Sequence, residues 1–222
     1  MSHESAASPE LIRTQRAGGL WRVTLNRAEK ANALTRAMLQ QLLETFRHAA
    51  EDKDVRALTL TGQGERVFCA GADLSELSTD PDNPADAIWD EMSDALGTLP
   101  ILTIALINGP CIGGGMTLAL NCDIRLCVPE ANFSYPVLRN GVLPSKRDCR
   151  QLRNLIGPGR TSMLLLGGER VMATEADAWG LVDRVVERSA LATTAAALSE
   201  TALGADPAHL KAIKHLCLGD LP

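Results

Sequence analysis

The stretch that decides the fold is ILTIALINGPCIGGG, residues 101–115. Its first seven residues form an apolar run, which is typical of a strand buried on both faces of a parallel sheet. The run ends in a glycine-rich turn, after which residues 116–122 predict a short apolar helix and residues 123–128 a further strand. This order of strand, glycine turn, helix and strand predicts an α/β fold.

The same alternation extends toward the amino end. Residues 20–26 and 55–61 alternate in polarity and are rich in β-branched side chains, so each predicts a strand. Between them, Thr35 is a suitable N-cap for a helix with an apolar stripe that reaches about residue 52. Residues 1–18 predict a loose or edge-forming start. Residues 78–86, rich in Pro, Asp and Asn, predict a mobile loop before a helix that ends at Gly97.

Helices and one strand are predicted beyond Pro144. Gly157 separates two expected helices, at 146–156 and 158–166. Thr174 and Asp177 have the spacing of a capping box for a helix that Gly180 ends. A strand is expected at 181–187, and the tail predicts a helix with Asp206 as N-cap, Pro207 as its first residue and Gly219 after its end.

Length and composition limit the class of protein. The chain has 222 residues, 45% of them hydrophobic and 22% charged, with a net charge of −5. This suits a globular core, predicted at residues 1–188, followed by a short helical segment at 189–222. An acidic chain without long basic runs is a poor binder of nucleic acid or of an anionic membrane surface. The longest apolar stretch, residues 99–107, is too short to span a bilayer.

The amino end and the cysteines bear on the compartment. The first ten residues, MSHESAASPE, lack the basic and apolar regions of a signal peptide, so we expect a cytoplasmic protein. Six cysteines are spread along the chain without any CxxC pair, which argues against a structural zinc site and leaves no metal site to propose. Most of them lie in apolar runs, where we expect buried, reduced thiols.

Two glycine turns carry the candidate chemistry. One is FCAGADL at residues 68–74, and the other is the triplet Gly113 to Gly115 that opens a helix. A helix start presents unpaired N–H groups, and glycines allow a ligand to approach them closely. If the turns face each other, one N–H from each forms an oxyanion hole. Tight packing of the helix on the strand is the alternative interpretation, while the spacing fits neither a dinucleotide fingerprint nor a P-loop.

Several motifs in this order resemble the enoyl-CoA hydratase/isomerase family, the crotonases. The resemblance covers about residues 10–218, and the segments that carry it are Leu25-Asn26-Arg27 with Asn32-Ala33-Leu34, residues 68–74, residues 107–115, residues 119–125, Ala131-Asn132-Phe133, Glu175-Ala176 and Gly180-Leu181-Val182. It implies a spiral of stacked ββα units with a helical C-terminal tail, and a homotrimer or a dimer of trimers. It also implies that helices near the carboxyl end close the CoA site, so either the helix from Asp206 closes it here or the site is more open.

The resemblance assigns roles to particular residues. It implies an acyl-CoA thioester as ligand, a place in fatty acid metabolism, and no cofactor beyond the coenzyme A of the substrate. The backbone N–H groups of Ala72 and Gly114 would hold the thioester oxygen and stabilise an enolate. The residues expected to contact the substrate are Lys30, Ala31, Ala70, Asp73, Leu74, Thr117, Tyr135 and Arg139.

The chain departs from the family's acid–base pattern. The hydratases it resembles place one glutamate where Thr117 stands and another where Val137 stands, and some isomerases place an aspartate at Ser145. Three explanations remain open: decarboxylation of a malonyl-type thioester, a relocated proton carrier, or acyl-CoA binding without turnover as a scaffolding paralogue. Tyr135 is a candidate carrier but fits a pocket wall better. Asp148 could swing toward the pocket as a carrier, but it is expected to pair on a helix surface with Arg147 or Arg150. Glu76 is a further candidate carrier that is expected to be a solvated loop charge, and Arg139 could bind an acidic acyl group.

Overall fold

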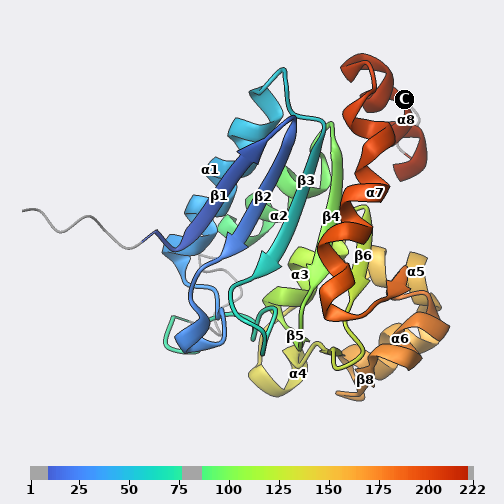
Figure 1. Ribbon diagram of the computed structural model, residues 1–222. Helices are drawn as coiled ribbons and strands as arrows, with labels where there is room; N and C mark the ends of the chain where they lie inside the picture. Colours follow the sequence, from blue (N-terminus) through green and yellow to red (C-terminus); the bar gives the residue numbers. More distant parts are fainter. Residues whose placement is uncertain (1–9, 77–86, 220–222) are drawn as a thin grey trace, which may run out of the picture.

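A computed structural model describes residues 10–76 and 87–219 of the chain. Its main sheet has six strands in the order β1-β2-β3-β4-β6-β9 (Figure 1). These strands are β1 (Ile12–Ala17), β2 (Leu20–Leu25), β3 (Ala57–Gly62), β4 (Leu102–Ile107), β6 (Ile124–Cys127) and β9 (Arg184–Val185). Only the β1–β2 pair is antiparallel, so the α/β class and the buried parallel strand β4 are confirmed.

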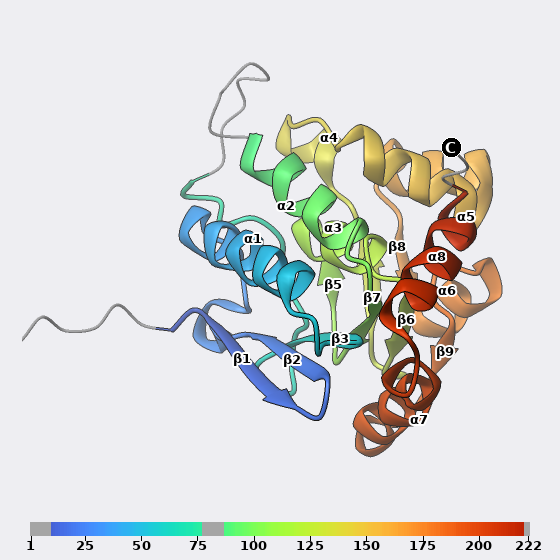
Figure 2. The same ribbon diagram turned by 90° about the horizontal axis from the view of Figure 1, so that it is seen from above.

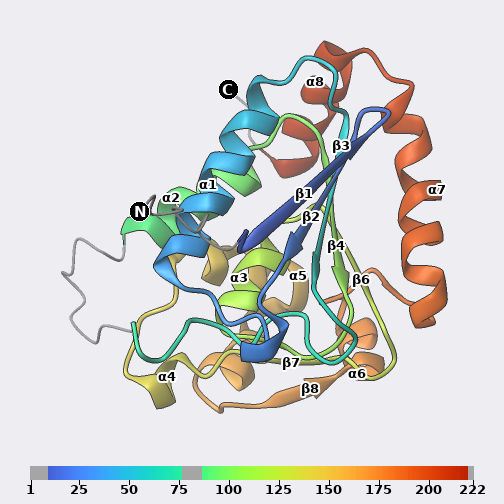
Figure 3. The ribbon, with the colours of Figure 1, turned by 60° about the vertical axis from the view of Figure 1, so that its left-hand side comes forward.

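Helices cover both faces of this sheet. On one face lie α1 (Arg36–Glu51) and α2 (Ala87–Gly97), while α7 (Leu191–Leu203) crosses the other face over β3, β4 and β6 (Figures 2 and 3). The Thr35 side chain accepts a hydrogen bond from the Met38 amide at 3.2 Å, which confirms the predicted cap of α1. The apolar side of α1, including Met38, Leu42 and Phe46, is fully buried against the sheet.

A second, smaller sheet lies at the carboxyl ends of the main strands. It contains β5 (Cys111–Ile112), β7 (Asn132–Ser134) and β8 (Arg170–Met172), in the order β5-β7-β8. The remaining elements around it are α3 (Gly114–Leu120), α4 (Val137–Asn140), α5 (Lys146–Leu165) and α6 (Ala173–Trp179), with short 3-10 turns at Ala28–Lys30 and Arg188–Ala190. These small elements place the two glycine turns beneath the main sheet in the view of Figure 1.

Two helix boundaries test the sequence predictions. Gly157 has φ 78° and ψ 167° inside α5, so two helices meet there at a kink, as predicted. The predicted capping box is wrong, because α6 begins at Ala173, after Met172, and no side chain caps it.

The strand predicted at 181–187 is only two residues long. The loop predicted at 78–86 and residues 1–9 lie outside the described residues, while β1 occupies a sheet edge as expected.

The last helix, α8 (Pro207–Leu218), is anchored at the amino ends of the parallel strands. Asp206 caps it by accepting from the His209 amide at 3.0 Å. The buried Lys214 ammonium donates to the Ile101 carbonyl at 2.7 Å and to Asp123 Oδ2 at 2.8 Å. Ile101 precedes β4 and Asp123 precedes β6. Helix α8 therefore lies at the amino ends of the parallel strands, opposite the glycine turns at their carboxyl ends. Within this chain α8 therefore does not close the site, which leaves the more open site of the two expectations.

The cysteines lie as predicted. Cys69, Cys111, Cys122 and Cys127 are buried and unpaired, whereas Cys149 is partly buried and Cys217 is exposed. Burial raises the pKa of Cys69, Cys122 and Cys127 to about 12, so these thiols stay protonated at neutral pH. In the part of the chain that the structure describes, no helix is both long and apolar enough to cross a membrane.

Candidate active site

The two glycine turns touch each other. Gly71 has φ 101°, a conformation that suits glycine, and a Cβ built there would lie 3.1 Å from the Ile112 carbonyl oxygen and 3.4 Å from the Gly114 nitrogen. The turn after β3 and the turn after β5 are thus in van der Waals contact. Glycine at position 71 is required both by the backbone conformation and by this close approach.

Two amides at the contact have no acceptor within the described part of the chain. The Leu34 amide donates to the Gly71 carbonyl at 2.7 Å, and the Leu34 carbonyl accepts from the Asp73 amide at 2.8 Å. The Ala72 amide, which lies between these two bonds, takes part in neither. In the second turn, the Gly113 amide donates to the Ser134 carbonyl at 3.0 Å. Neither the Ala72 nor the Gly114 N–H donates to any acceptor among residues 10–76 and 87–219.

A tryptophan closes over the second turn. A Cβ on Gly114 would lie 2.6 Å from the Trp89 ring and 3.2 Å from the Leu34 side chain, so both residues form a wall beside this turn. Trp89 comes from the first turn of α2. This placement could not be predicted from the sequence, because Trp89 is far from both glycine motifs along the chain.

The segments expected to hold coenzyme A lie side by side. The Ala31 carbonyl accepts from the Ala70 amide at 3.0 Å, which joins the Lys30 segment to the first glycine turn. Ala31 has φ 52°, an uncommon left-handed conformation for a residue with a side chain. Lys30 is exposed, and so is Leu74, at 73% of its surface.

Asp73 already has protein partners. Its carboxylate accepts from the Arg27 guanidinium at 2.7 Å, from the Ser75 hydroxyl at 2.7 Å and from the Ser75 amide at 3.0 Å. The bonds from Ser75 and then the Arg27 guanidinium lower the pKa of Asp73 to about 2. The Asp73 carboxylate, as an anion, thus holds the loop next to Ala72 in place through its bonds to Ser75 and Arg27.

A buried polar cluster lies behind the second turn. Thr117 Oγ1 donates to Asp148 Oδ2 at 2.7 Å, Tyr135 Oη donates to the same oxygen at 2.7 Å, and the two hydroxyls are 2.9 Å apart. Asp148 is fully buried in the first turn of α5, so the expected surface pairing with Arg147 or Arg150 is wrong. Alternation of polarity around helix 146–156 could not reveal a carboxylate whose partners come from other elements.

The electrostatics of this cluster keep the phenol protonated. Burial first, and then the Asp148 carboxylate, raise the pKa of Tyr135 well above its ordinary value. Tyr135 therefore acts as a hydrogen-bond donor at neutral pH. The interpretation of Tyr135 as a mere wall residue does not account for its bond to Asp148.

The other positions considered for acid–base work have structural roles. Val137 is buried at the start of α4. The Ser145 hydroxyl caps α5 by accepting from the Asp148 amide at 3.0 Å. The Glu76 carboxylate accepts from the Arg36 amide at 2.6 Å, at the start of α1.

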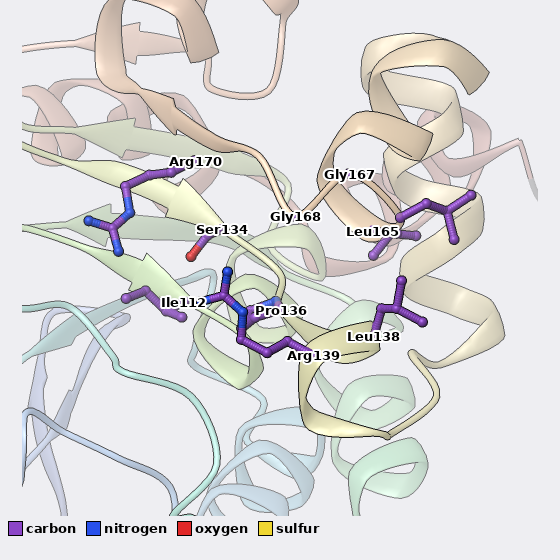
Figure 4. A pocket seen from close by; sticks show the side chains of 10 residues that line it. Ile112, Ser134, Pro136, Leu138, Arg139, Leu165, Gly167, Gly168 and Arg170 are labelled. Atoms are coloured by element: carbon purple, nitrogen blue, oxygen red, sulfur yellow. The ribbon is translucent and has the colours of Figure 1, made fainter.

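Arg139 lies near the second glycine turn, at a cavity that reaches Ile112, the residue directly before Gly113. It lines this cavity of about 470 Å³ together with Arg170, Ser134, Ile112 and the backbone of Gly167 and Gly168 (Figure 4). Neither Ala72 nor Gly114 lines this cavity. Neither arginine forms an ion pair with another residue of the described ranges, so two guanidinium groups face the cavity without a carboxylate partner there.

Fold and site together define an α/β protein with two converging glycine turns at the carboxyl ends of its parallel strands. The family model of enoyl-CoA hydratase/isomerase matches residues 15–218. The chain belongs to the enoyl-CoA hydratase/isomerase family, the crotonases, as its motifs indicated.

Three relatives illustrate this membership. A probable enoyl-CoA hydratase (echA6) of Mycobacterium bovis is 37% identical over 163 residues, which cover 73% of this chain and 65% of the relative. The 1,2-epoxyphenylacetyl-CoA isomerase of Escherichia coli is 34% identical over 188 residues, covering 82% of this chain and 71% of that protein. A crystal structure of an enoyl-CoA hydratase/carnithine racemase from Magnetospirillum magneticum has a TM-score of 0.87 at 33% identity, covering 96% of this chain and 81% of that one.

Proposed function

We propose that the protein is an enzyme that binds an acyl-CoA thioester and stabilises its enolate through the Ala72 and Gly114 N–H groups. The observation that carries this proposal is the contact between the two glycine turns, together with the absence of acceptors for both amides among the described residues. Donors fixed in advance where negative charge develops typically contribute a factor of about 10²–10³ each. Two of them on one oxygen make the carbon next to the thioester carbonyl acidic.

The coenzyme A part of the ligand is proposed to lie along the first turn. The hydrogen bond between Ala31 and Ala70 supports this placement, because it presents both segments on one surface. The exposed Lys30 offers a cation to phosphate groups, and the exposed Leu74 offers an apolar contact. Asp73 would then act by holding the loop, and no cofactor beyond the substrate's coenzyme A is required.

Several relatives are named hydratases or isomerases, and the same reaction classes are candidates here. Thr117 and Val137 provide no carboxylate for the addition of water, so we favour a reaction that depends mainly on the enolate, such as isomerisation or decarboxylation. Binding without turnover is the alternative from another class. A nucleotide-binding module, the third possibility, would bind ADP as tightly as an acyl-CoA.

The decisive test compares butyryl-CoA with S-butyl-CoA, a thioether without the carbonyl, and with free coenzyme A. We expect calorimetry to give the highest affinity for the thioester. Infrared spectra of butyryl-CoA labelled with ¹³C at the carbonyl should show a lower stretching frequency when it is bound, because both N–H groups polarise the C=O bond. Equal affinities with an unshifted carbonyl band would overturn the proposal. A panel of acyl-CoAs analysed by mass spectrometry then separates turnover from binding alone.

Decarboxylation of a malonyl-type thioester is a second candidate, favoured by the unpaired Arg139 and Arg170 in one cavity. Two guanidinium groups suit a carboxylate on the acyl group. We expect Arg139→Ala and Arg170→Ala to weaken malonyl-CoA binding about tenfold each, the scale of a charge-assisted hydrogen bond, and to leave butyryl-CoA binding unchanged. Equal losses for both ligands would contradict a specific role of these arginines, and calorimetry measures both.

We further propose a homotrimer or a dimer of trimers in the cytoplasm. Exposed apolar side chains support self-association, namely Leu138, Leu143, Leu166 and Met172. Leu138 and Leu166 line the arginine cavity, and exposed apolar side chains of this kind are typical of an interaction surface. Sedimentation equilibrium of the full chain measures the assembly, and a monomer at all concentrations would contradict it.

A further inference from the structure

Three oxygen atoms form a closed triangle behind the second glycine turn. They are Thr117 Oγ1, Tyr135 Oη and Asp148 Oδ2, with edges of 2.7, 2.7 and 2.9 Å. The three side chains are exposed by only 4%, 5% and 0%. The triangle is thus shielded from bulk solvent.

The triangle has more edges than protons. Each hydroxyl carries one proton and a carboxylate carries none, so two protons serve three edges while Asp148 is ionised. One edge then joins two oxygens without a proton between them. A third proton completes the ring, because every oxygen can then donate once and accept once. The arrangement holds either two or three protons without moving a heavy atom, which is what a temporary proton store requires.

The carboxylate is fixed from its other side. Asp148 Oδ1 accepts from the Asn121 amide at 3.1 Å, and Asn121 in turn accepts from the Arg147 guanidinium. Arg147 also contacts Asp94 of α2, at 3.3 Å. These contacts from α3, α5 and α2 direct Asp148 Oδ2 toward the two hydroxyls.

The triangle is carried by segments that adjoin the second glycine turn. Gly113 donates to the carbonyl of Ser134, the residue that directly precedes Tyr135. Thr117 lies three residues after Gly114 on α3, hence on the same helix face about one turn further along. Thr117 therefore belongs to the helix that the second turn opens, and Tyr135 directly follows the strand residue that the Gly113 amide binds. Of the two, a phenol is the group that enzymes use for proton transfer.

Resting on the proposed acyl-CoA function, we propose that Tyr135 is the catalytic residue that exchanges a proton with the carbon next to the thioester carbonyl, and that Asp148 is its positioning residue. In the forward direction the C–H bond breaks and its electron pair enters the thioester as the enolate. The released proton moves to Tyr135 Oη while the phenolic proton passes to Asp148 Oδ2. The reverse step returns a proton to carbon, so no other reactant is needed.

The experiment follows deuterium incorporation into butyryl-CoA in D₂O by mass spectrometry, with binding measured by calorimetry. We expect the wild type to incorporate deuterium at the carbon next to the carbonyl. The Tyr135→Phe and Asp148→Asn variants should be slower by roughly 100-fold or more, the scale of general acid–base catalysis, while their butyryl-CoA affinity is unchanged. A purely structural role would instead lower affinity and thermal stability together.

Thr161→Val is the matched control, because Thr161 is another buried helical threonine whose hydroxyl bonds the Gly157 carbonyl at 2.8 Å, away from the site. It should exchange at the wild-type rate. Circular dichroism melting verifies that each variant is folded. Wild-type binding without deuterium incorporation, or folded variants that exchange at the wild-type rate, would overturn this inference alone. Failure to bind butyryl-CoA would overturn the proposed function and this inference together.

Discussion

A Gly114→Ala variant is expected to process its acyl-CoA substrate roughly 100-fold more slowly than the wild type, the scale of losing one oxyanion donor. The added methyl group would lie 2.6 Å from the Trp89 ring and 3.2 Å from Leu34, so the ring or the turn has to move. Either movement displaces the Gly114 N–H from the thioester oxygen. The infrared carbonyl band of bound butyryl-CoA should return toward its position in free solution.

Two further variants separate this effect from a general loss of structure. Gly159→Ala adds the same methyl group in α5 where no atom lies within 4 Å, and it should behave like the wild type. Adding Trp89→Leu to Gly114→Ala makes room for the methyl group and should restore part of the carbonyl shift. A fully shifted band in the Gly114→Ala single variant would contradict the proposed role of this amide.

Lys214→Met is expected to cause the largest loss of stability, about 3 kcal/mol, the usual scale for breaking a buried ion pair. The ammonium is exposed by only 7% and joins α8 to Asp123 and to the Ile101 carbonyl. Without it, Asp123 keeps only its bonds from Thr103, and the carbonyl loses a donor. For a chain of this size the melting temperature should fall by roughly 6–12 °C.

Lys211→Met on the same helix is the control, since Lys211 is exposed and makes no ion pair within the described residues. Its melting temperature should stay close to that of the wild type. Limited proteolysis should cleave the Lys214→Met variant first within α8. Equal melting temperatures for the two variants would show that the buried ammonium contributes nothing to holding this helix.

The sequence was most informative where one element determines its own pattern. The apolar run of β4, the Thr35 cap of α1 and the Asp206 and Gly219 limits of α8 were all predicted, because hydrophobic periodicity and capping are local properties. The strands β5 and β7, with two and three residues, were missed because such lengths show no periodicity. Helix α7 lies within the segment predicted as helical, residues 189–222, but its bounds were not predicted, since its run of Ala and Thr gives little contrast between its faces.

In the candidate site, too, features set by local sequence were predicted and contacts between distant segments were not. The glycine turns were identified from the chain, since a positive φ and a close backbone approach demand glycine at Gly71 and Gly113. The partners of Asp148 could not be identified, because Thr117 and Tyr135 reach it from elements 31 and 13 residues away. Trp89 was missed for the same reason. Contacts between distant segments require the tertiary structure.

The anchoring of α8 at the amino ends of the parallel strands, away from the glycine turns, has a practical consequence. Cys217 on this helix is the exposed thiol among the described cysteines, Cys149 is partly buried, and burial keeps the other four out of reach. A maleimide dye or a surface linker should therefore attach preferentially to Cys217. The label then sits at the opposite end of the parallel strands from both glycine turns, so the immobilised protein keeps its ligand entrance open.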